Sequence, residues 1–464
     1  MLAPVGARAA CVTYALRNPS YPDADAHAAR HRLELAAGCT RLARHERLLL
    51  RGSRDARPAR ARRRRHPRQA SRGAHVRHRP TRRLAPRSLR RRVPHRRSST
   101  GVPGDRRNSD ARGQRTRGDR RRPLVSRAWS FDQFGLDHLK LVEVDEPAPG
   151  PGQVTLAVSA CSVNYRDTLM VAGHYDPRMH LPLVPLSDGV GRVVAIGEGV
   201  DRVAVGDRVA ATFAPRWIAG EPERAIIRHT RGGPLPGMLA ERRTLDAEGV
   251  VKIPDHLTDE EAATLPCAAL TAWSSLVTEG NVTAGSTVLV QGTGGVSLFA
   301  LQLGKLLGAR VMITSSSDEK LERAKALGAD ATLNYKTTPE WGRPAAKWAG
   351  EGVDLVVEVG GAKTFDESLK AVRPGGIVSL IGNLSGSTAP VPLTRILMSQ
   401  VRVQGILVGH RNGFEAMNRA FAAYPEVRPV VDRVFAFEEA PEALRHLRKG
   451  DHFGKVVIRV AAAS

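Results

Sequence analysis

The clearest pattern along the chain is a regular alternation of short apolar runs with segments of helical periodicity. The runs typical of buried strands are Thr287–Val290, Arg310–Thr314, Asp354–Val359 and Ile377–Ile381. The segments between them predict helices at Glu319–Leu327 and Lys363–Val372, and a first helix whose apolar stripe is Val296, Phe299, Ala300, Leu303 and Leu307. Alternation at this spacing predicts βαβ units, and therefore a doubly wound parallel sheet in an α/β protein.

The residues before this alternation have few helical signals. Short, partly alternating apolar runs occur at Leu139–Val144, Gln153–Ala160 and Val190–Ile196, with Pro- and Gly-rich turns between them. They predict a small closed β domain. After Pro254, Thr258 followed by Glu261 three residues later is typical of a capped helix start. The last segment, 410–464, is mixed in character and is expected to return to this first domain.

The first quarter of the chain differs sharply in composition. Residues 1–127 contain 36 Arg, no Lys and 8 Asp/Glu, a net charge of +28, whereas residues 128–464 carry 35 Lys+Arg against 38 Asp/Glu, a net −3. Without apolar periodicity, the Arg-rich segment 1–125 is predicted to be disordered. A phosphate-binding tail and a targeting peptide are two interpretations of it. The favoured one is an over-extended reading frame, with a true start near Val125.

Cysteine usage and hydropathy exclude several classes of protein. The four cysteines, Cys11, Cys39, Cys161 and Cys267, form no CxxC pair, and no apolar run approaches the length of a membrane span. A cytoplasmic protein with no membrane association is expected.

A glycine-rich turn joins the first strand of the alternating region to its helix. In Gln291–Ser297, Gly292 allows a tight turn and Gly294 lets the backbone approach a pyrophosphate. The helix start then offers free N–H groups to the phosphates. Ser297 replaces the third glycine of G-x-G-x-x-G. The βαβ context makes dinucleotide binding the preferred interpretation over a plain tight turn.

The end of the second strand bears on the choice between NAD and NADP. An acid there would hold the ribose 2′-hydroxyl of NAD, but the strand ends in Ser315-Ser-Ser317, with Lys320 one turn later. Hydroxyls and a cation suit a 2′-phosphate, so NADP(H) is preferred to NAD(H). Asp318 is the counter-argument, and it is expected to cap the next helix instead.

Several motifs, taken together, resemble the medium-chain dehydrogenase/reductase superfamily, most closely its zinc-independent quinone-oxidoreductase and alcohol-dehydrogenase-like branch. They are Pro149–Gly152, Val163–Asp167, Pro185–Gly189, Val205–Val209, Leu265–Trp273, Gly292–Ser297 and His452–Val457. The resemblance implies a GroES-like β-barrel catalytic domain at 126–266, rejoined by 410–464, and a Rossmann NADP-binding domain at 267–409. It also implies a homodimer or homotetramer.

The same resemblance places the metal-ligand positions of zinc-dependent members on Asn164, on the Leu186–Asp188 motif and on Cys267. The first position holds an amide and the second motif has no histidine, so only Cys267 is a ligand of the usual type. The cysteine-rich lobe of structural zinc is also missing. No zinc, catalytic or structural, is expected.

Without a Lewis acid, negative charge developing on the substrate must be met by hydrogen bonds and a proton. The resemblance makes Tyr165 and Asn164 the catalytic candidates: Tyr165 as acid or donor, and Asn164 as neutral donor to a carbonyl oxygen. The alternative is that Tyr165 packs against the cofactor ribose and Asn164 stabilises a turn. Asp167 and Cys161 are expected to be structural, and Cys267 to form a wall of the cleft.

The remaining expected cofactor contacts also follow from the resemblance. Beside Gly292, Thr293, Gly294, Gly295 and Val296 of the turn, and Ser315 and Lys320 at the ribose, they are Thr271, Gly382, Asn383, Leu407, Val408 and Lys455. Thr271 and Gly382-Asn383 would lie at the nicotinamide, and Lys455 would reach the phosphates. Each could equally be a residue of the fold.

The predicted function is reduction of a quinone or an α,β-unsaturated carbonyl compound by NADPH, without zinc. An alcohol or aldehyde dehydrogenase using Tyr165 and Asn164 is the first alternative. The second is a non-catalytic, nucleotide-bound protein that binds nucleic acid through the Arg-rich segment, although neither nucleic acid nor a membrane is the expected partner. The expected partners are a small-molecule substrate and further copies of the chain.

Overall fold

The computed structural model describes residues 124–460 of the 464-residue chain. The predicted disorder of the Arg-rich segment lies outside the described residues, except at its last two positions. There, Leu124 and Val125 pair with Glu146 and Asp145 in a two-stranded antiparallel sheet of β1 (Leu124–Phe131) and β2 (Leu139–Glu146). Strand pairing therefore begins two residues after Arg122, the last arginine of the segment, and the boundary at 125 stays a prediction.

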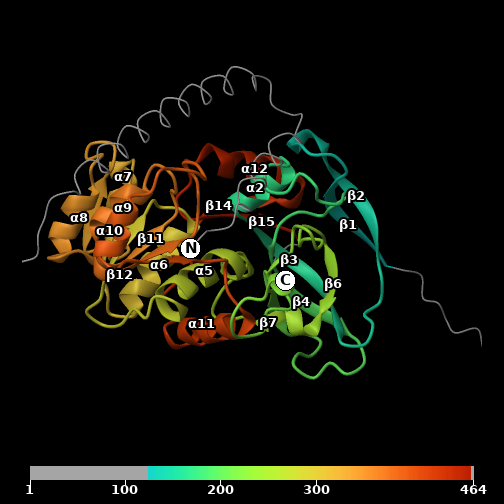
Figure 1. The fold of residues 1–464 in the computed structure, drawn as a ribbon. Helices are drawn as coiled ribbons and strands as arrows, with labels where there is room; N and C mark the ends of the chain where they lie inside the picture. Colours follow the sequence, from blue (N-terminus) through green and yellow to red (C-terminus); the bar gives the residue numbers. More distant parts are fainter. Residues whose placement is uncertain (1–123, 461–464) are drawn as a thin grey trace, which may run out of the picture. The chain divides into compact units, whose positions relative to one another are not determined.

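A seven-stranded, largely antiparallel sheet forms the first part of the described chain (Figure 1). Its strands are β3 (Gln153–Val163), β4 (Asp188–Ile196), β5 (Arg208–Ala211), β6 (Arg242–Asp246), β7 (Val250–Lys252), β14 (Val431–Ala436) and β15 (Lys455–Arg459). The order is β14-β15-β3-β4-β5-β7, and β6 pairs with β3. Because β15 pairs antiparallel with β3, the C-terminal segment returns to this sheet. The domain boundaries themselves stay predictions.

The second sheet has six strands, all parallel. They are β8 (Thr287–Gln291), β9 (Arg310–Ser315), β10 (Ala331–Asn334), β11 (Val353–Glu358), β12 (Val372–Leu380) and β13 (Arg402–Gly405). In the strand order β10-β9-β8-β11-β12-β13, successive strands of the chain are first added on one side of β8 and then, from β11 onward, on its other side. A ligand crevice is expected outside the carboxyl ends of the strands at such a change of side. The predicted Rossmann-type doubly wound sheet is confirmed.

Helices accompany both sheets. Those within the parallel-sheet region are α5 (Leu270–Trp273), α6 (Gly295–Leu306), α7 (Asp318–Ala326), α8 (Gly342–Ala349), α9 (Phe365–Ala371) and α10 (Leu393–Met398). The others are α2 (Tyr165–Val171), α3 (Arg224–Ile227), α4 (Asp259–Ala262), α11 (Arg411–Ala423) and α12 (Ala440–Lys449). On α6 the predicted stripe faces the core: Phe299, Ala300 and Leu303 are buried, and Val296 and Leu307 pack at its margin.

Two predicted helix starts had different outcomes. The capping box at Thr258 is confirmed, since its backbone N–H donates to Glu261 and its hydroxyl accepts from the Glu261 N–H. The expected cap of α7 by Asp318 was wrong. Ser317 is the cap, because its hydroxyl accepts from the Lys320 N–H at 3.3 Å, while Asp318 is the first helical residue and binds Asn334.

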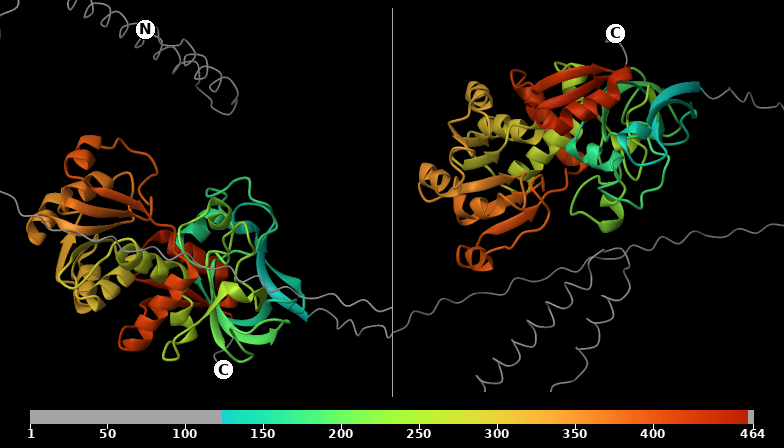
Figure 2. Two further views of the ribbon diagram at one scale, coloured as in Figure 1. Left: turned by 60° about the horizontal axis from the view of Figure 1, so that its bottom comes forward. Right: turned by 90° about the horizontal axis from the view of Figure 1, so that it is seen from above.

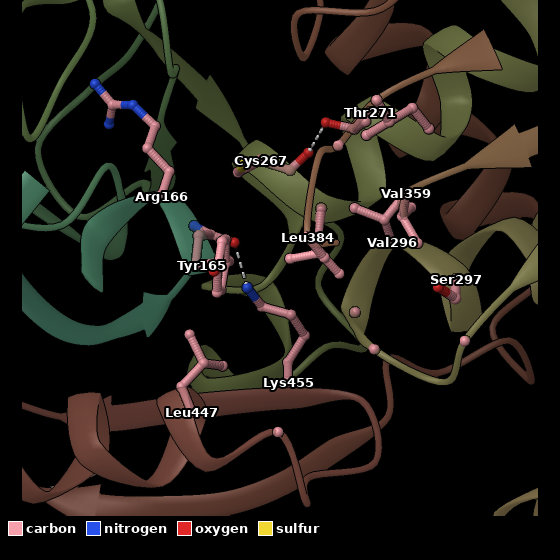
Figure 3. A pocket seen from close by; sticks show the side chains of 18 of the residues that line it. Tyr165, Arg166, Cys267, Thr271, Val296, Ser297, Val359, Leu384, Leu447 and Lys455 are labelled. Atoms are coloured by element: carbon pink, nitrogen blue, oxygen red, sulfur yellow. Dashed lines mark hydrogen bonds between the residues drawn. The ribbon is translucent and has the colours of Figure 1, made fainter. Parts of the chain in front are cut away.

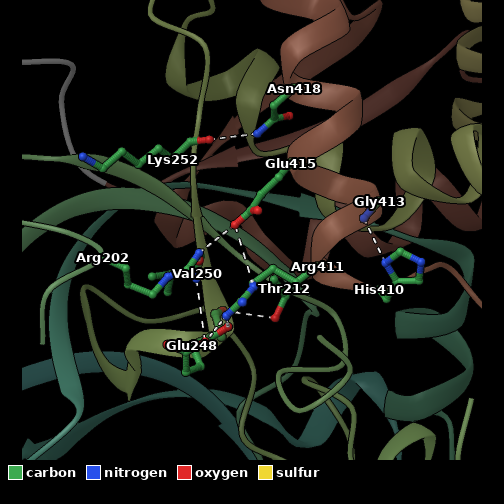
Figure 4. A network of polar contacts seen from close by, with 11 residues as sticks. Arg202, Thr212, Glu248, Val250, Lys252, His410, Arg411, Gly413, Glu415 and Asn418 are labelled. Atoms are coloured by element: carbon green, nitrogen blue, oxygen red, sulfur yellow. Dashed lines mark hydrogen bonds and ion pairs between the residues drawn. The ribbon is translucent and has the colours of Figure 1, made fainter. Parts of the chain in front are cut away.

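Within the C-terminal part of the chain, α11 connects the two sheet regions, because it contacts β7 of the first sheet (Figures 1 and 2). Figure 4 shows this polar network. Arg202 donates to Glu415 at 2.8 Å, and Asn418 donates to the Lys252 carbonyl at 2.8 Å. These contacts link α11 to the sheet that carries β7, while α11 also packs on α5 of the parallel-sheet region.

Candidate active site

A cavity of about 480 Å³ lies at the carboxyl ends of the parallel strands and extends to the start of α2 (Figure 3). Every residue predicted to form the site lines it: Asn164, Tyr165, Thr271, Gly292, Thr293, Gly294, Gly295, Val296, Ser315, Lys320, Gly382, Asn383, Leu407, Val408 and Lys455. They come from both sheets. The structure therefore brings the whole predicted set together, while the role of each residue stays a prediction.

The glycine-rich turn takes the conformation its residues were expected to permit. Gly292 has a φ of 72°, a left-handed value that favours glycine. Gly294 forms an isolated parallel bridge with Gly454, so the turn contacts the strand entry of β15. Ser297 is buried, and its hydroxyl donates to the Gln291 carbonyl at 2.7 Å. The serine at the third glycine position thus ties α6 to the end of β8.

Beneath the turn lies a buried polar cluster that sequence reasoning missed. Glu358, fully buried at the end of β11, accepts hydrogen bonds from Gly360, Gly361, Thr364, Ser368 and Gln291. The Gln291 amide also accepts from the backbone of the next loop at 3.2 Å. This cluster fixes the ends of β8 and β11, the two strands that flank the crevice. A lone Glu after an apolar run was the available signal.

At the opposite end of the cavity, Ser315 and Lys320 lie with three residues that were not predicted: Tyr335, Arg448 and His452. The Lys320 ammonium donates to the His452 carbonyl at 3.1 Å, which joins α7 to the loop before β15. Burial lowers the pKa of His452 to about 4, so its ring is neutral near pH 7. Arg448 and Lys320 leave this end of the cavity cationic.

At the start of α2, Asn164 lies opposite Lys455. Val456 of β15 pairs antiparallel with Val163 of β3, so Lys455, which precedes Val456, faces Asn164, which follows Val163. The Lys455 ammonium donates to Asn164 Oδ1 at 2.5 Å and to the Val163 carbonyl at 2.9 Å. Lys455 is only 3% exposed. Its stem passes over the glycine-rich turn, where a Cβ added at Gly295 would lie 2.3 Å from Lys455 Cδ.

The other two expected metal-ligand positions adjoin this pair. Asn164 Nδ2 lies 3.4 Å from Ser187 Oγ, and that hydroxyl donates to Asp188 at 2.7 Å. Asp188 is fully buried, which raises the pKa of its carboxyl, although Lys455 and its hydrogen bonds oppose the shift. Burial likewise raises the pKa of the Cys267 thiol. Cys267 lines the cavity and remains a thiol at neutral pH.

Tyr165 is the first residue of α2, with 43% of its surface exposed. The helix start is held by Asp167, whose carboxylate accepts from the Asn164 N–H at 2.8 Å. Asp167 therefore has the structural role expected of it. Cys161 is also structural, since it is fully buried and its thiol donates to the Met238 carbonyl at 3.1 Å.

The remaining predicted contacts surround the region where the two sheets meet. Thr271 is buried and its hydroxyl donates to the Cys267 carbonyl at 2.6 Å. Val408 has a φ of 51°, an uncommon value for a β-branched residue. Leu407 and Asn383 complete this wall of the cavity. With this conformation at Val408, the loop after β13 lines the cavity.

Two kinds of feature are absent from the described residues, 124–460. No group of three or more His, Cys, Asp or Glu side chains there has the geometry to hold a metal ion. None of the helices in the same range is both long and apolar enough to cross a membrane.

Comparison with known proteins agrees with this arrangement. Residues 150–255 match the family model described as alcohol dehydrogenase GroES-like domain, and 295–423 match zinc-binding dehydrogenase. A zinc-type alcohol dehydrogenase-like protein of Schizosaccharomyces pombe is 41% identical over 334 residues, covering 70% of this chain and 96% of that protein. An acryloyl-coenzyme A reductase of Sulfurisphaera tokodaii is 30% identical, with 69% and 96% covered.

A crystal structure of an NAD-dependent alcohol dehydrogenase superimposes with a TM-score of 0.67 at 34% identity, and the match covers 72% of this chain and 100% of that one. The two matched ranges include β3 to β7 of the first sheet and β9 to β13 of the second, together with part of the residues that line the cavity. The chain belongs to the medium-chain dehydrogenase/reductase superfamily and is an NAD(P)-dependent oxidoreductase of the alcohol dehydrogenase-like type.

Proposed function

We propose that this protein uses NADPH to reduce an α,β-unsaturated carbonyl compound or a quinone, without zinc. The observation that carries the proposal is the Asn164–Lys455 pair. It places an amide and an ammonium, instead of metal ligands, at the wall of the cavity. Groups of this kind stabilise negative charge on an oxygen through hydrogen bonds.

The side chains at the expected metal position do not suit tetrahedral zinc. Such a site needs three protein ligands chosen from thiolate, imidazole and carboxylate. Here Asn164 Oδ1 already accepts from the Lys455 ammonium and Ser187 is a hydroxyl, so among Asn164, Ser187 and Cys267 the one side chain of the usual ligand type is Cys267. A cation 2.5 Å from the amide oxygen would repel a divalent metal approaching the same atom.

The preference for NADPH rests on the cationic end of the cavity. Ser315, Ser316 and Tyr335 offer hydroxyls there, and Lys320 and Arg448 offer positive charge. Hydroxyls and cations suit a phosphate dianion. The Asp318 carboxylate, three residues after Ser315, accepts from Asn334 at 2.7 Å, which supports the view that it does not serve the ribose.

When bound, the cofactor supplies the hydride. The protein's part is to hold the substrate carbonyl and to exclude water. Asn164 Nδ2 and the Tyr165 hydroxyl are the donors proposed for the carbonyl oxygen, with the final proton coming from Tyr165 or from water. Cys267 and the apolar side chains of Leu384 and Val359 form the walls around the reacting atoms.

The relatives support two substrate classes. Acryloyl-coenzyme A, the substrate named for the Sulfurisphaera tokodaii relative, contains an α,β-unsaturated thioester, which supports reduction of a C=C bond. The alcohol dehydrogenase names support oxidation of alcohols or reduction of aldehydes as the second candidate. A homodimer or homotetramer with a cytoplasmic location is part of the proposal.

The test is an oxidation screen of the full chain with NADPH and NADH against 1,2-naphthoquinone, an enone, an enoyl thioester and a simple aldehyde. We expect turnover of the first three with NADPH at least tenfold above NADH. Asn164→Ala should lower kcat by roughly 10²-fold, the usual cost of losing one donor to a developing oxyanion. Tyr165→Phe should lower it by roughly tenfold or more, because proton transfer passes to water.

Activity with aldehydes alone would favour the second candidate function. Metal analysis belongs to the same experiment, and one tightly held zinc per chain would contradict the zinc-free proposal. If no acceptor supports NADPH oxidation, and salt-sensitive nucleic-acid binding disappears on removal of the Arg-rich segment, the protein is not the proposed reductase.

A further inference from the structure

Lys455 is a buried cation whose two hydrogen bonds are made to protein atoms at the start of α2. Its ammonium lies at the start of α2, and only its stem passes the glycine-rich turn (Figure 3). A buried ammonium is costly unless it is hydrogen-bonded. Here the Val163 carbonyl and Asn164 Oδ1 accept two of its three N–H groups. The strand register of β15 on β3 imposes this placement.

The contact with Lys455 determines which way the Asn164 amide points. An ammonium has no acceptor, so the atom that faces it must be the amide oxygen. Nδ2 is then directed to the other side, toward Ser187 Oγ at 3.4 Å, the outer limit of a hydrogen bond, and toward the buried Asp188 carboxyl, whose pKa is lowered by a hydrogen bond from the Asn164 side chain. Charge at the amide oxygen also polarises the amide and strengthens its N–H groups as donors.

From this geometry we infer that Lys455 is a positioning residue: it holds the Asn164 amide oxygen toward itself, so that Nδ2 can give one N–H group to Ser187 and Asp188 and the other to a substrate oxygen in the cavity. Through that amide it also supplies positive charge at the position that holds a metal in zinc-dependent enzymes. Without the ammonium, the amide can rotate by half a turn. It then presents an acceptor to a substrate oxygen that is gaining negative charge. The inference rests on the proposed reductase function and adds the means by which Asn164 acts.

The alternative role, a contact between Lys455 and the cofactor phosphates, has a different kinetic consequence. If Lys455 contacts a phosphate, removing its ammonium would weaken NADPH binding. An amide-positioning contact would be lost as a lower kcat with NADPH binding unchanged, because it matters most in the transition state. Lys320 provides the comparison, since it lies at the cationic end of the same cavity and is proposed to bind the 2′-phosphate.

The experiment measures kcat with an active acceptor and the Kd for NADPH by fluorescence titration, on full-length Lys455→Met, Lys455→Gln and Lys320→Met. We expect Lys455→Met to lower kcat by roughly 10²-fold with the Kd changed less than about threefold. Lys455→Gln keeps a donor for Asn164 Oδ1 and should retain more activity than Lys455→Met. Lys320→Met should do the reverse, raising the Kd while kcat changes little. Lys325→Met, on the exposed side of α7, is the unaffected control.

A double-mutant cycle with Asn164→Ala separates action through the amide from any other effect. Adding Lys455→Met to the Asn164→Ala variant should lower kcat by less than about threefold further. The inference would be overturned if the fold-losses in kcat of the two single variants multiplied in the double variant. It would also be overturned if Lys455→Met weakened NADPH affinity and left kcat unchanged. If Lys455→Met does not fold, Lys455→Gln in the same cycle decides. An inactive wild type that still binds NADPH would instead refute the proposed function.

Discussion

Asp167, at the start of α2, makes a contribution to the free energy of unfolding that depends on pH. Asp167 is fully buried and caps the helix, and burial, the largest influence, raises the pKa of its carboxyl from 3.8 to about 6. Nearby Asp188 adds to the shift, and Arg166 and Lys455 oppose it. A carboxyl with a raised pKa binds its proton more tightly in the folded chain than in the unfolded chain. Its contribution to stability is therefore present at low pH and lost as the pH rises through 6.

Replacing the residue by Asn removes this titration and keeps an acceptor for the helix start. The unfolding free energy of the wild type minus that of Asp167→Asn should be about 2 kcal/mol larger at pH 4.5 than at pH 7. Urea denaturation of both proteins at the two pH values measures this difference. A difference between the two proteins that does not change with pH would show that the Asp167 carboxyl has no raised pKa in the folded chain.

At the scale of elements, the turn between β8 and α6 combines a backbone constraint with a binding role. Gly292 has a φ of 72°, and a Cβ added there would meet nothing closer than Ser297 Oγ at 3.9 Å. A side chain at this position would therefore be disfavoured by the backbone conformation and not by a clash. Gly199, in the turn after β4, has a φ of 77° and open space around it, so it is a matched control away from the cavity.

Alanine at either glycine should destabilise the fold by about 1–2 kcal/mol, the cost of a left-handed non-glycine residue. Only Gly292→Ala should also weaken NADPH binding, by roughly tenfold, because relief of the strain moves the N–H groups at the start of α6. Thermal unfolding and NADPH titration test both effects. Equal NADPH affinity in the two variants would mean that the turn does not hold the pyrophosphate.

For the whole molecule, the parallel sheet ends in a strand with an apolar neighbour. β13 is the last strand of its sheet, and within the described residues α10 exposes Leu393, Leu397 and Met398 to between 72% and 76%. A terminal strand beside exposed apolar side chains favours pairing with another chain. The proposed homodimer would therefore form through β13 and α10 of two copies of the chain.

Light scattering coupled to size-exclusion chromatography tests this surface. The wild type should have twice the 50.2 kDa mass of one chain or a higher multiple, and Leu397→Asp should shift it toward the monomer, since a charge would be buried at the interface. Val205→Asp is the matched control, because Val205 is 60% exposed in a turn of the other sheet. A monomeric wild type, or a Leu397→Asp protein that still dimerises, would exclude this interface.

The sequence by itself determined the α/β class, the parallel sheet and the position of the cofactor turn, because periodicity and glycine placement are local properties. The resemblance collected the candidate residues, and all of them line one cavity. Local pattern was not enough at the start of α7, where Ser317 and Asp318 are both good caps: Ser317 is the cap, and Asp318 is bonded to Asn334 of β10.

Only the tertiary structure joined Lys455 to Asn164. These residues are 291 positions apart, and the register of β15 on β3, set by pairing along the whole strand, brings them into contact. The same is true of the contact between Gln291 and the buried Glu358, which are 67 positions apart, whereas the other donors to Glu358 follow it within ten residues. A sequence shows which groups are available at the site, but long-range strand pairing and burial decide which atoms face one another and which charges must be satisfied there.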